Sequence, residues 1–333
     1  MGTKPLGFVP DAFRTAMTDA ADKPIVAAEP RDYVQLLKPR VMSLVVFTAL
    51  TGLVVAPGQM NPLLAAISVL CIALGAGSAG ALNMALEGET DALMRRTRGR
   101  PVAAGRIPQG DALTYGIILS IASVSLLGLG VSWLAGGLLG LTIVYYAGLY
   151  TLVLKRRTPQ NIVIGGAAGA FPPVIGWAAA TGEAPWQAWL LFLIIFLWTP
   201  PHSWALALYS AGDYAKAGIP MMPVARGASS TRLQILIYSL VLVPVAVLPG
   251  VVGLGGPVYL AVSIGGGLVF LLLAWRLFRS RAGDQPDKAE AVGREAALYD
   301  VRVEAKAARN LFAYSILYLF GLFAALLIEA ALL

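Results

Sequence analysis

Three oxygen-bearing side chains recur at intervals of four residues near the end of a long apolar segment. They are Asn83, Glu87 and Asp91, in the run Asn83-Met-Ala-Leu-Glu-Gly-Glu-Thr-Asp91. On an α-helix this spacing stacks the three side chains on one face. Carboxylates at a membrane boundary are costly unless they are paired or metal-bound, and Mg²⁺ prefers oxygen ligands that it often shares with phosphates. The motif indicates a magnesium site; the alternative is a solvated helix end with pairs such as Asp91–Arg95.

An arginine-rich run follows this acidic motif directly. It reads Arg95-Arg-Thr-Arg-Gly-Arg100-Pro101. The planar fork of donors on an arginine matches two phosphate oxygens. A carboxylate–metal site beside such a cluster is an arrangement that binds a diphosphate. Taken alone, the arginines would be expected only to anchor a loop at the cytoplasmic membrane surface.

A second basic run, Lys155-Arg-Arg-Thr-Pro-Gln-Asn161, precedes another apolar segment. If the intervening segments span the membrane, this run lies at the same membrane face as the acidic motif. Lys155 can then reach the same anion. A purely topogenic charge is the simpler explanation of this lysine.

The remaining polar motif runs from Trp198-Thr-Pro-Pro-His202 to Asp213-Tyr-Ala-Lys216. The adjacent prolines predict a break in the helix, which a membrane protein tolerates where the break is buried or lines a cavity. His202 is then a polar group near the break. It could be a contact of iron or of a propionate, a proton carrier near neutral pH, or an ordinary packed histidine. Asp213 is a candidate ligand of a second Mg²⁺, and Lys216 a candidate contact of phosphate.

The composition of the 333 residues shows what kind of fold must position these motifs. Hydrophobic residues make up 58% and charged residues 13%, and the mean hydropathy is +0.73. Because a soluble globular protein is about 25% charged, a soluble enzyme is excluded. The single cysteine, Cys71, excludes an intrachain disulfide, and the single histidine excludes a site with several histidine ligands.

Nine apolar segments are long enough to be membrane-spanning helices, since about 20 residues cross a ~30 Å hydrocarbon core. We expect an all-α polytopic membrane protein, with nine transmembrane helices bundled around a central cavity that opens to the cytoplasmic side. Residues 1–36 are polar and predict a cytoplasmic N-terminal tail, and residues 37–333 predict the transmembrane domain. The predicted spans lie near residues 41–57, 62–84, 112–129, 132–153, 161–180, 187–207, 232–250, 257–277 and 310–331.

All 25 lysines and arginines fall in five segments on one side of these spans. This segregation predicts a cytoplasmic N-terminus and a C-terminus on the outer side of a bacterial cytoplasmic membrane. It also explains the net charge of +7. A nucleic-acid partner is disfavoured, because the cations are spread over membrane-bound loops and do not form one soluble basic domain.

Together these motifs resemble the UbiA-type intramembrane prenyltransferases. Asn83-x3-Glu87-x3-Asp91, followed by Thr97-Arg-Gly-Arg100-Pro101, is similar to the first acidic motif of that family. The run from Lys155 to Trp177 and the block Trp198-Thr-Pro-Pro-His202 are more similar to the branch that farnesylates haem. The resemblance extends over nearly the whole chain.

The resemblance implies a reaction and a ligand set. The implied substrates are farnesyl diphosphate and haem b, and the implied cofactor is Mg²⁺. The farnesyl group is transferred to the 2-vinyl group of haem b and water is added, which gives haem O. The implied metal ligands are Asn83, Glu87, Asp91 and Asp213, which are catalytic together with Lys216. The diphosphate ligands would be Arg95, Arg98, Arg100 and Lys155, and the haem contact would be His202.

Two residues depart from the family's pattern: Glu87 stands in place of an aspartate, and Ser203 where an aromatic residue is expected. Five aromatic residues are candidates for contact with the allylic cation or the porphyrin, although most aromatics in such spans simply pack. They are Tyr145, Tyr146, Tyr150, Trp177 and Trp198. The family also implies haem A synthase or terminal-oxidase assembly factors as partners.

Two other functions remain open at the level of the sequence. A prenyltransferase for an aromatic acceptor such as 4-hydroxybenzoate would share the acidic motif, but it leaves Thr158-Pro-Gln-Asn161 and Pro200-Pro-His202 unexplained. A transporter is expected to place its charges and broken helices at the middle of the membrane. Here the charges cluster at one membrane face, which favours the enzyme.

Overall fold

The structure is a computed structural model that describes residues 28–284 and 305–332, and every regular element in these residues is a helix. Residues 1–27 of the predicted tail and the segment 285–304 lie outside the described residues, together with the cations that they carry. The helices are α2 (Pro30–Leu36), α3 (Pro39–Val55), α4 (Pro62–Leu86), α5 (Gly88–Ala92), α6 (Gln109–Gly130), α7 (Trp133–Val144), η1 (Tyr145–Leu154), α8 (Asn161–Ala170), α9 (Pro172–Thr181), α10 (Trp186–Tyr209), α11 (Ala211–Lys216), α12 (Met222–Arg226), α13 (Ala228–Val251), α14 (Pro257–Arg279) and α16 (Ala305–Leu332).

Eight helical segments of the described chain are long and apolar enough to cross a membrane. They are α4, α6, α7 with η1, α8 with α9, α10, α13, α14 and α16. A ninth span forms if α2 and α3, which meet at a bend of 51°, are counted as one. The predicted all-α bundle is confirmed, and its helices start and end within five residues of the predicted spans.

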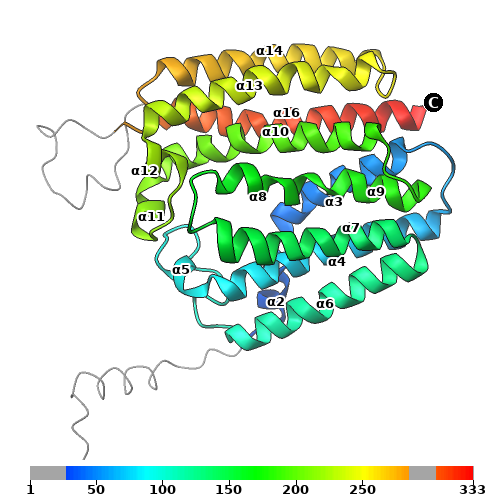
Figure 1. The fold of residues 1–333 in the computed structure, drawn as a ribbon, viewed down its shortest axis with the longest axis horizontal. Helices are drawn as coiled ribbons and strands as arrows, with labels where there is room; N and C mark the ends of the chain where they lie inside the picture. The colour runs from blue at the N-terminus through cyan, green and yellow to red at the C-terminus, as the bar shows by residue number, and fades with distance from the viewer. Residues whose placement is uncertain (1–27, 285–304, 333) are drawn as a thin grey trace, which may run out of the picture.

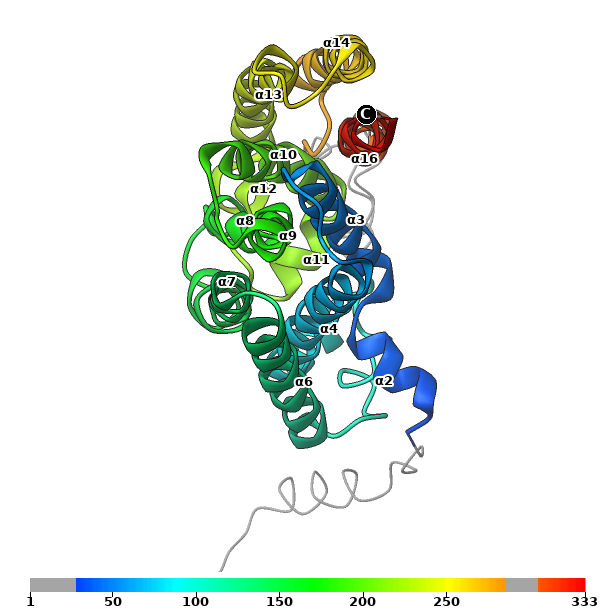
Figure 2. The same cartoon turned by 90° about the vertical axis from the view of Figure 1, so that its right-hand side faces the viewer.

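The long helices pack side by side along a common direction (Figure 1). Seen at 90° to that view, α8 and α9 lie between a group made of α10, α13, α14 and α16 and a group made of α4, α6 and α7 (Figure 2). The short helices α5, α11 and α12 gather at one end of the bundle (Figure 1). Because these helices follow α4 and α10, the acidic motif and the segment with Asp213 come to the same end.

One predicted span is wound more loosely than an α-helix over its second half. Residues Tyr145–Leu154 form the π-helix η1, and the backbone N–H of Lys155 donates to the carbonyl of Tyr150, five residues back, at 3.0 Å. The hydroxyl of Thr151 donates to the carbonyl of Tyr146 at 2.8 Å. Short π-helical stretches occur often at functional sites, because they rotate the following side chains relative to a regular helix.

The predicted break at Pro200-Pro201 is wrong, because α10 continues through both prolines to Tyr209. The fixed φ of proline is compatible with a helix, and each proline removes only one N–H donor. Both prolines are buried, so the packing of neighbouring helices holds the helix together. An interruption occurs instead at Phe171, before Pro172, where α8 ends and α9 begins.

Helices α3 and α9 approach each other closely at two glycines. A Cβ atom at Gly52 would meet the backbone of Pro173, and a Cβ atom at Gly176 would meet the backbone of Ala49. Small residues permit such close approach, and in lipid the resulting van der Waals packing is a main source of helix association. The crossing fixes α3, whose first residues contribute to the site described below.

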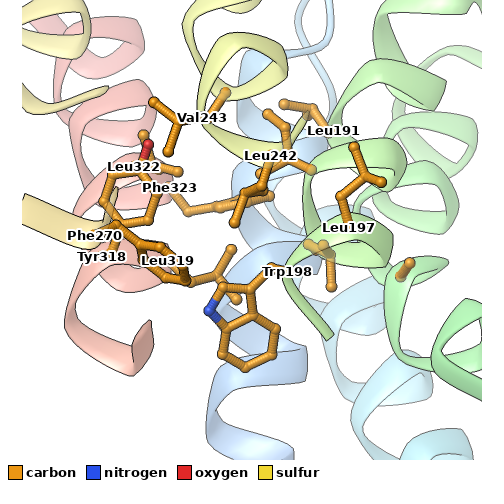
Figure 3. Packing of buried hydrophobic residues seen from close by; sticks show 14 of the residues in the cluster. Leu191, Leu197, Trp198, Leu242, Val243, Phe270, Tyr318, Leu319, Leu322 and Phe323 are labelled. Atoms are coloured by element: carbon orange, nitrogen blue, oxygen red, sulfur yellow. The ribbon is translucent and has the colours of Figure 1, made fainter. Parts of the chain in front are cut away.

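The largest buried apolar cluster joins α10 to α13, α14 and α16. Figure 3 shows Trp198, Leu242, Phe270, Tyr318 and Phe323 packed together in this cluster. The indole Nε1 of Trp198 donates to the carbonyl of Ser315 at 2.7 Å. The contact fixes α10 against α16 and so determines which face of α10 is turned to the cavity beside it.

Candidate active site

The three side chains of the acidic motif are buried together at the end of α4. Asn83, Glu87 and Asp91 are 2%, 4% and 1% exposed. The single helix expected from their spacing is interrupted, since α4 ends at Leu86 and α5 begins at Gly88. The backbone N–H of Glu87 nevertheless donates to the carbonyl of Asn83, and that of Asp91 to the carbonyl of Glu87. The i, i+4, i+8 relationship therefore survives the interruption.

Both the nitrogen and the oxygen of the Asn83 side-chain amide are hydrogen-bonded. Its Nδ2 donates to Glu87 Oε2 at 2.8 Å and to Thr151 Oγ1 at 3.1 Å. Its Oδ1 accepts from Nζ of Lys38 at 2.5 Å. The end of α4 is thus tied to η1 through Thr151 and to the start of α3 through Lys38.

Each carboxylate of the motif is paired with a cation of a predicted basic run. Lys155 Nζ lies 2.5 Å from Glu87 Oε1, and Arg100 Nη1 lies 2.6 Å from Asp91 Oδ2. In the part of the chain that the structure describes, the ion pair found at Asp91 is with Arg100, because the loop after α5 folds back and presents this residue. The loop is held there by Thr97, whose hydroxyl donates to the carbonyl of Asp91 at 2.8 Å.

The donor atoms of this cluster fit Mg²⁺. Oδ1 of Asp91 is buried without a hydrogen-bond partner among the described residues, and the neighbouring groups of Glu87 and Asn83 also offer oxygen, the element that Mg²⁺ prefers. No three His, Cys, Asp or Glu residues of the described chain form a metal-binding group. The carboxylates number only two here, and the third oxygen ligand would be an amide.

The segment that carries Asp213 and Lys216 lies near the acidic motif. Met94, in the loop after α5, shares a buried apolar cluster with Tyr214, which adjoins Asp213 on α11. Asp213 is half-buried and Lys216 is exposed. Among the hydrogen bonds and ion pairs of the described residues, none joins Asp213 to Glu87 or Asp91. Arg95 and Arg98 are exposed on the loop between α5 and α6.

A large, mostly apolar cavity lies beside the acidic cluster. It has a volume of about 680 Å³ and is bounded by α3, η1, α8, α10 and α16. The predicted aromatics Tyr146, Tyr150 and Trp198 line it, whereas Trp177 is buried in the core and the hydroxyl of Tyr145 donates to the carbonyl of Ile164. Other polar residues at its wall are Arg40, Ser43, Thr48, Thr199, His202 and Ser203.

His202 is held on three sides. Its ring stacks on Trp198, with centroids 4.2 Å apart, and on Phe312, with centroids 4.5 Å apart. Its Nδ1 lies 2.7 Å from Ser315 Oγ. The hydroxyl of Ser315 donates its one proton to the carbonyl of Phe312 at 2.6 Å, so it must accept from His202. In its neutral form the imidazole therefore carries its proton on Nδ1 and keeps a lone pair on Nε2.

A second, smaller cavity shares part of its wall with the large one and reaches Lys38, which is bonded to Asn83. Its volume is about 130 Å³, and Lys38 and Tyr146 are among the residues that line it. Tyr146 and Val41 contribute to the walls of both cavities. Lys38 Nζ lies 5.8 Å from the centre of the Tyr146 ring. The Tyr146 side chain thus lies between Lys38 of the polar cluster and the large apolar cavity.

The sequence interpretation missed three residues of this arrangement. By sequence alone Lys38 counts among the cytoplasmic cations, and Thr151 and Ser315 are single hydroxyl residues within apolar spans. Each of the three makes its contact with a residue at least 45 positions away in the sequence. The only local signal was Lys38 itself, a cation placed directly before Pro39 at the start of a span.

The sequence profile of the UbiA prenyltransferase family matches residues 45–295. Among curated proteins, the protoheme IX farnesyltransferase of Caulobacter vibrioides is 64% identical over 305 residues, which are 90% of this chain and 91% of the relative. The protoheme IX farnesyltransferase of Maricaulis maris is 60% identical and covers 94% of this chain and 93% of its own. That of Brucella anthropi is 58% identical and covers 91% of each chain.

Solved structures show the same fold at low identity. A structure of digeranylgeranylglyceryl phosphate synthase has a TM-score of 0.67 and 16% identity, and it covers 90% of this chain and 98% of its own. A UbiA homolog from Archaeoglobus fulgidus bound to GPP and Mg²⁺ has a TM-score of 0.59 and 16% identity, with 86% and 99% covered.

Proposed function

The chain belongs to the UbiA prenyltransferase family, and we propose that it transfers the farnesyl group of farnesyl diphosphate to the 2-vinyl group of haem b, with addition of water, to give haem O. It is a multi-pass membrane enzyme of the prenyltransferase class. The curated relatives that are 58–64% identical over most of the chain carry the name protoheme IX farnesyltransferase.

One observation carries the proposal beyond the family name: the buried polar cluster adjoins a large apolar cavity. Tyr146 lines the 680 Å³ cavity, and the Lys38 ammonium beside its ring is bonded to Asn83. A reaction between a prenyl diphosphate and an apolar acceptor needs a polar site next to an apolar one. The diphosphate must bind among charged groups, whereas the acceptor must bind among apolar groups. The arrangement supports a prenyl transfer at the boundary that Tyr146 forms.

We assign Asn83, Glu87 and Asp91 as ligands of Mg²⁺, with Asp213 as a candidate for a second ion. The unpartnered, buried Oδ1 of Asp91 supports this assignment, and a structural relative binds Mg²⁺ together with a prenyl diphosphate. The ion supplies positive charge that stabilises the departing diphosphate. Asp213 lies half-buried on α11, at the same end of the bundle as the acidic motif, which supports its place in this set.

The cations around the acidic motif bind and stabilise the leaving group. Arg100 and Lys155 already lie within 2.6 Å of the carboxylates, and Arg95, Arg98 and Lys216 lie on neighbouring exposed segments. With Mg²⁺ and a diphosphate bound, the carboxylates would hold the ion and these cations would donate to the phosphate oxygens. Preorganised donors of this kind stabilise charge that develops as the C1–O bond breaks.

The chemistry after ionisation takes place in the apolar cavity. Cleavage of the C1–O bond leaves an allylic cation, which the faces of Tyr146, Tyr150 and Trp198 can stabilise. The terminal carbon of the vinyl group supplies the electron pair for the new C–C bond. The resulting cation takes up water and loses one proton, which gives the hydroxyethylfarnesyl side chain.

Haem b fits the chemistry of the larger cavity better than 4-hydroxybenzoate does. A volume of about 680 Å³ is in the range of sites for large ligands and exceeds the needs of a single benzene ring. The wall carries a guanidinium, Arg40, for a propionate, and an imidazole, His202, whose Nε2 has a free lone pair. We assign His202 as the haem contact.

The cations of the described loops support an N-terminus in the cytoplasm and a C-terminus outside a bacterial cytoplasmic membrane. Haem O released into this membrane would pass to a haem A synthase or to assembly factors of a terminal oxidase. These are the partners that we propose.

The experiment that tests the function uses the purified protein in detergent with haem b, farnesyl diphosphate and Mg²⁺, and detects haem O by mass. We expect product that depends on both substrates and is lost with a chelator. Absence of haem O, with prenyl transfer to 4-hydroxybenzoate or to another quinone precursor instead, would reject the acceptor. Absence of any prenyl transfer would reject the enzyme assignment itself.

A further inference from the structure

Lys38 has an unusual backbone conformation at the bend between α2 and α3. Its φ and ψ are 52° and 57°, and it is the only non-glycine residue of the described chain with a positive φ. L-residues other than asparagine, aspartate and glycine seldom occupy this left-handed region. The neighbouring helices meet at 51° around it, so the fold retains a strained lysine where a glycine would be easier to accommodate.

The strained backbone directs the Lys38 ammonium into the acidic cluster. Nζ lies 2.5 Å from Oδ1 of Asn83, and the side chain lines the smaller cavity beside Tyr146. The contact with Asn83 thus joins the bend between α2 and α3 to the acidic motif.

This contact determines what the Asn83 side chain can do. With Oδ1 bonded to Lys38, Nδ2 donates to Glu87 and to Thr151, so the amide is held in one orientation. The ammonium of Lys155 likewise contacts both carboxylate oxygens of Glu87. The ammonium groups of Lys38 and Lys155 therefore contact oxygen atoms that we assign as metal ligands.

We propose that Lys38 is a positioning residue: its ammonium occupies the Asn83 oxygen when no metal is bound and moves to a diphosphate oxygen when metal and diphosphate enter together. The flexible four-carbon stem of lysine permits this exchange without a change in the backbone. Lys38 would then disfavour metal binding in the absence of diphosphate and favour diphosphate binding in its presence. The inference rests on the assignment of Asn83 as a metal ligand in the proposed function.

The test measures binding rather than turnover. Purified wild-type protein, Lys38→Asn and Lys38→Gly are titrated with Mn²⁺ alone, followed by its electron paramagnetic resonance signal. Both replacements tolerate the left-handed backbone, so at least one is expected to melt at the wild-type temperature. Arg96→Gln is the matched control, because it removes an exposed cation of the neighbouring loop that is no part of the proposed contact.

We expect Mn²⁺ to bind the Lys38 variants about fivefold more tightly than wild type, as for removal of one charge close to an ion in a half-buried site. Arg96→Gln should change the affinity by less than about twofold, because exposed charges are screened. Inorganic diphosphate, titrated at saturating Mn²⁺, should bind the Lys38 variants about fivefold more weakly.

Unchanged Mn²⁺ affinity in the Lys38 variants, an equal gain in Arg96→Gln, or unchanged diphosphate affinity would each overturn the proposal. The haem O assay distinguishes this failure from failure of the proposed function. Haem O formation with unchanged Mn²⁺ affinity in Lys38→Asn rejects only the role of Lys38. The expected binding changes, with prenyl transfer to another acceptor in place of haem O formation, reject only the acceptor.

Discussion

Lys155 and Glu87 form a largely buried ion pair across 68 residues of sequence. Nζ lies 2.5 Å from Oε1 and 2.6 Å from Oε2, and the two side chains are 13% and 4% exposed. The adjacent Arg156 donates to the hydroxyl of Thr90 at 2.7 Å. The basic run after η1 therefore docks on the acidic motif after α4, which a purely topogenic role for these cations would not require.

The ion pair predicts a compensating pair of substitutions. Lys155→Met leaves Glu87 as a buried, unpaired carboxylate, and the loss of stability should be about 3–5 kcal/mol. Adding Glu87→Gln removes that charge and should restore most of the stability, but not the activity. Thermal unfolding in detergent and the haem O assay, run on the two single variants and the double variant, check this. A double variant less stable than Lys155→Met would contradict the pairing.

Asp91→Ala should abolish turnover while the protein still inserts and folds. The substitution removes the unpartnered Oδ1 and the partner of Arg100, so metal and diphosphate binding both suffer, and we expect a loss of at least about 10²-fold in kcat. Glu89→Ala is the control, since Glu89 is an exposed carboxylate two residues away on α5. Near-normal haem O formation by Asp91→Ala would show that the metal site is placed wrongly.

The fold was predictable from the sequence because the membrane requirement acts locally. A span needs about 20 apolar residues whatever its neighbours are, so α4, α6 and α14 begin within about three residues of the predicted starts. The failure at Pro200-Pro201 has the opposite cause. Whether two prolines break a helix depends on packing around them, and that packing comes from residues of other helices.

The site was predictable only in part, for the same reason. The spacing of Asn83, Glu87 and Asp91 is local, and the structure keeps it. Thr151 and Ser315 are ordinary hydroxyl residues within apolar spans, and only the fold brings them to Asn83 and His202. The left-handed Lys38 could not be inferred, because nothing in its neighbours specifies a positive φ.

The close crossing of α3 and α9 predicts that two glycine-to-alanine substitutions will have different effects on stability. Gly176→Ala places a Cβ against the backbone of Ala49, which cannot move aside as a flexible side chain would, and should destabilise the protein by about 1–3 kcal/mol. Gly265→Ala on α14 meets nothing within 4 Å and should be neutral or stabilising by about 0.5–1 kcal/mol. Thermal unfolding of both variants in the same detergent measures the difference, and equal melting temperatures would contradict the close crossing.

The stacked imidazole of His202 predicts how haem binding responds to its two neighbours. His202→Phe retains the stacking on Trp198 and Phe312 but removes Nε2, and it should abolish the shift of the haem Soret band on binding. Ser315→Ala removes only the acceptor that fixes the Nδ1 proton, and we expect a loss of roughly tenfold in haem affinity, as for other groups that orient a ligating histidine. Ser203→Ala, in the same cavity wall, is the control and should bind haem as wild type does.

The same titrations with protoporphyrin IX, which has no iron, separate a contact with the iron from a contact with the ring. If Nε2 contacts iron, His202→Phe should lose affinity for haem b and keep its affinity for the iron-free porphyrin, because stacking and the apolar walls remain. If His202 acts only through packing, neither ligand should distinguish the variant from wild type. A wild-type Soret band and wild-type haem affinity in His202→Phe would therefore remove His202 from the acceptor site.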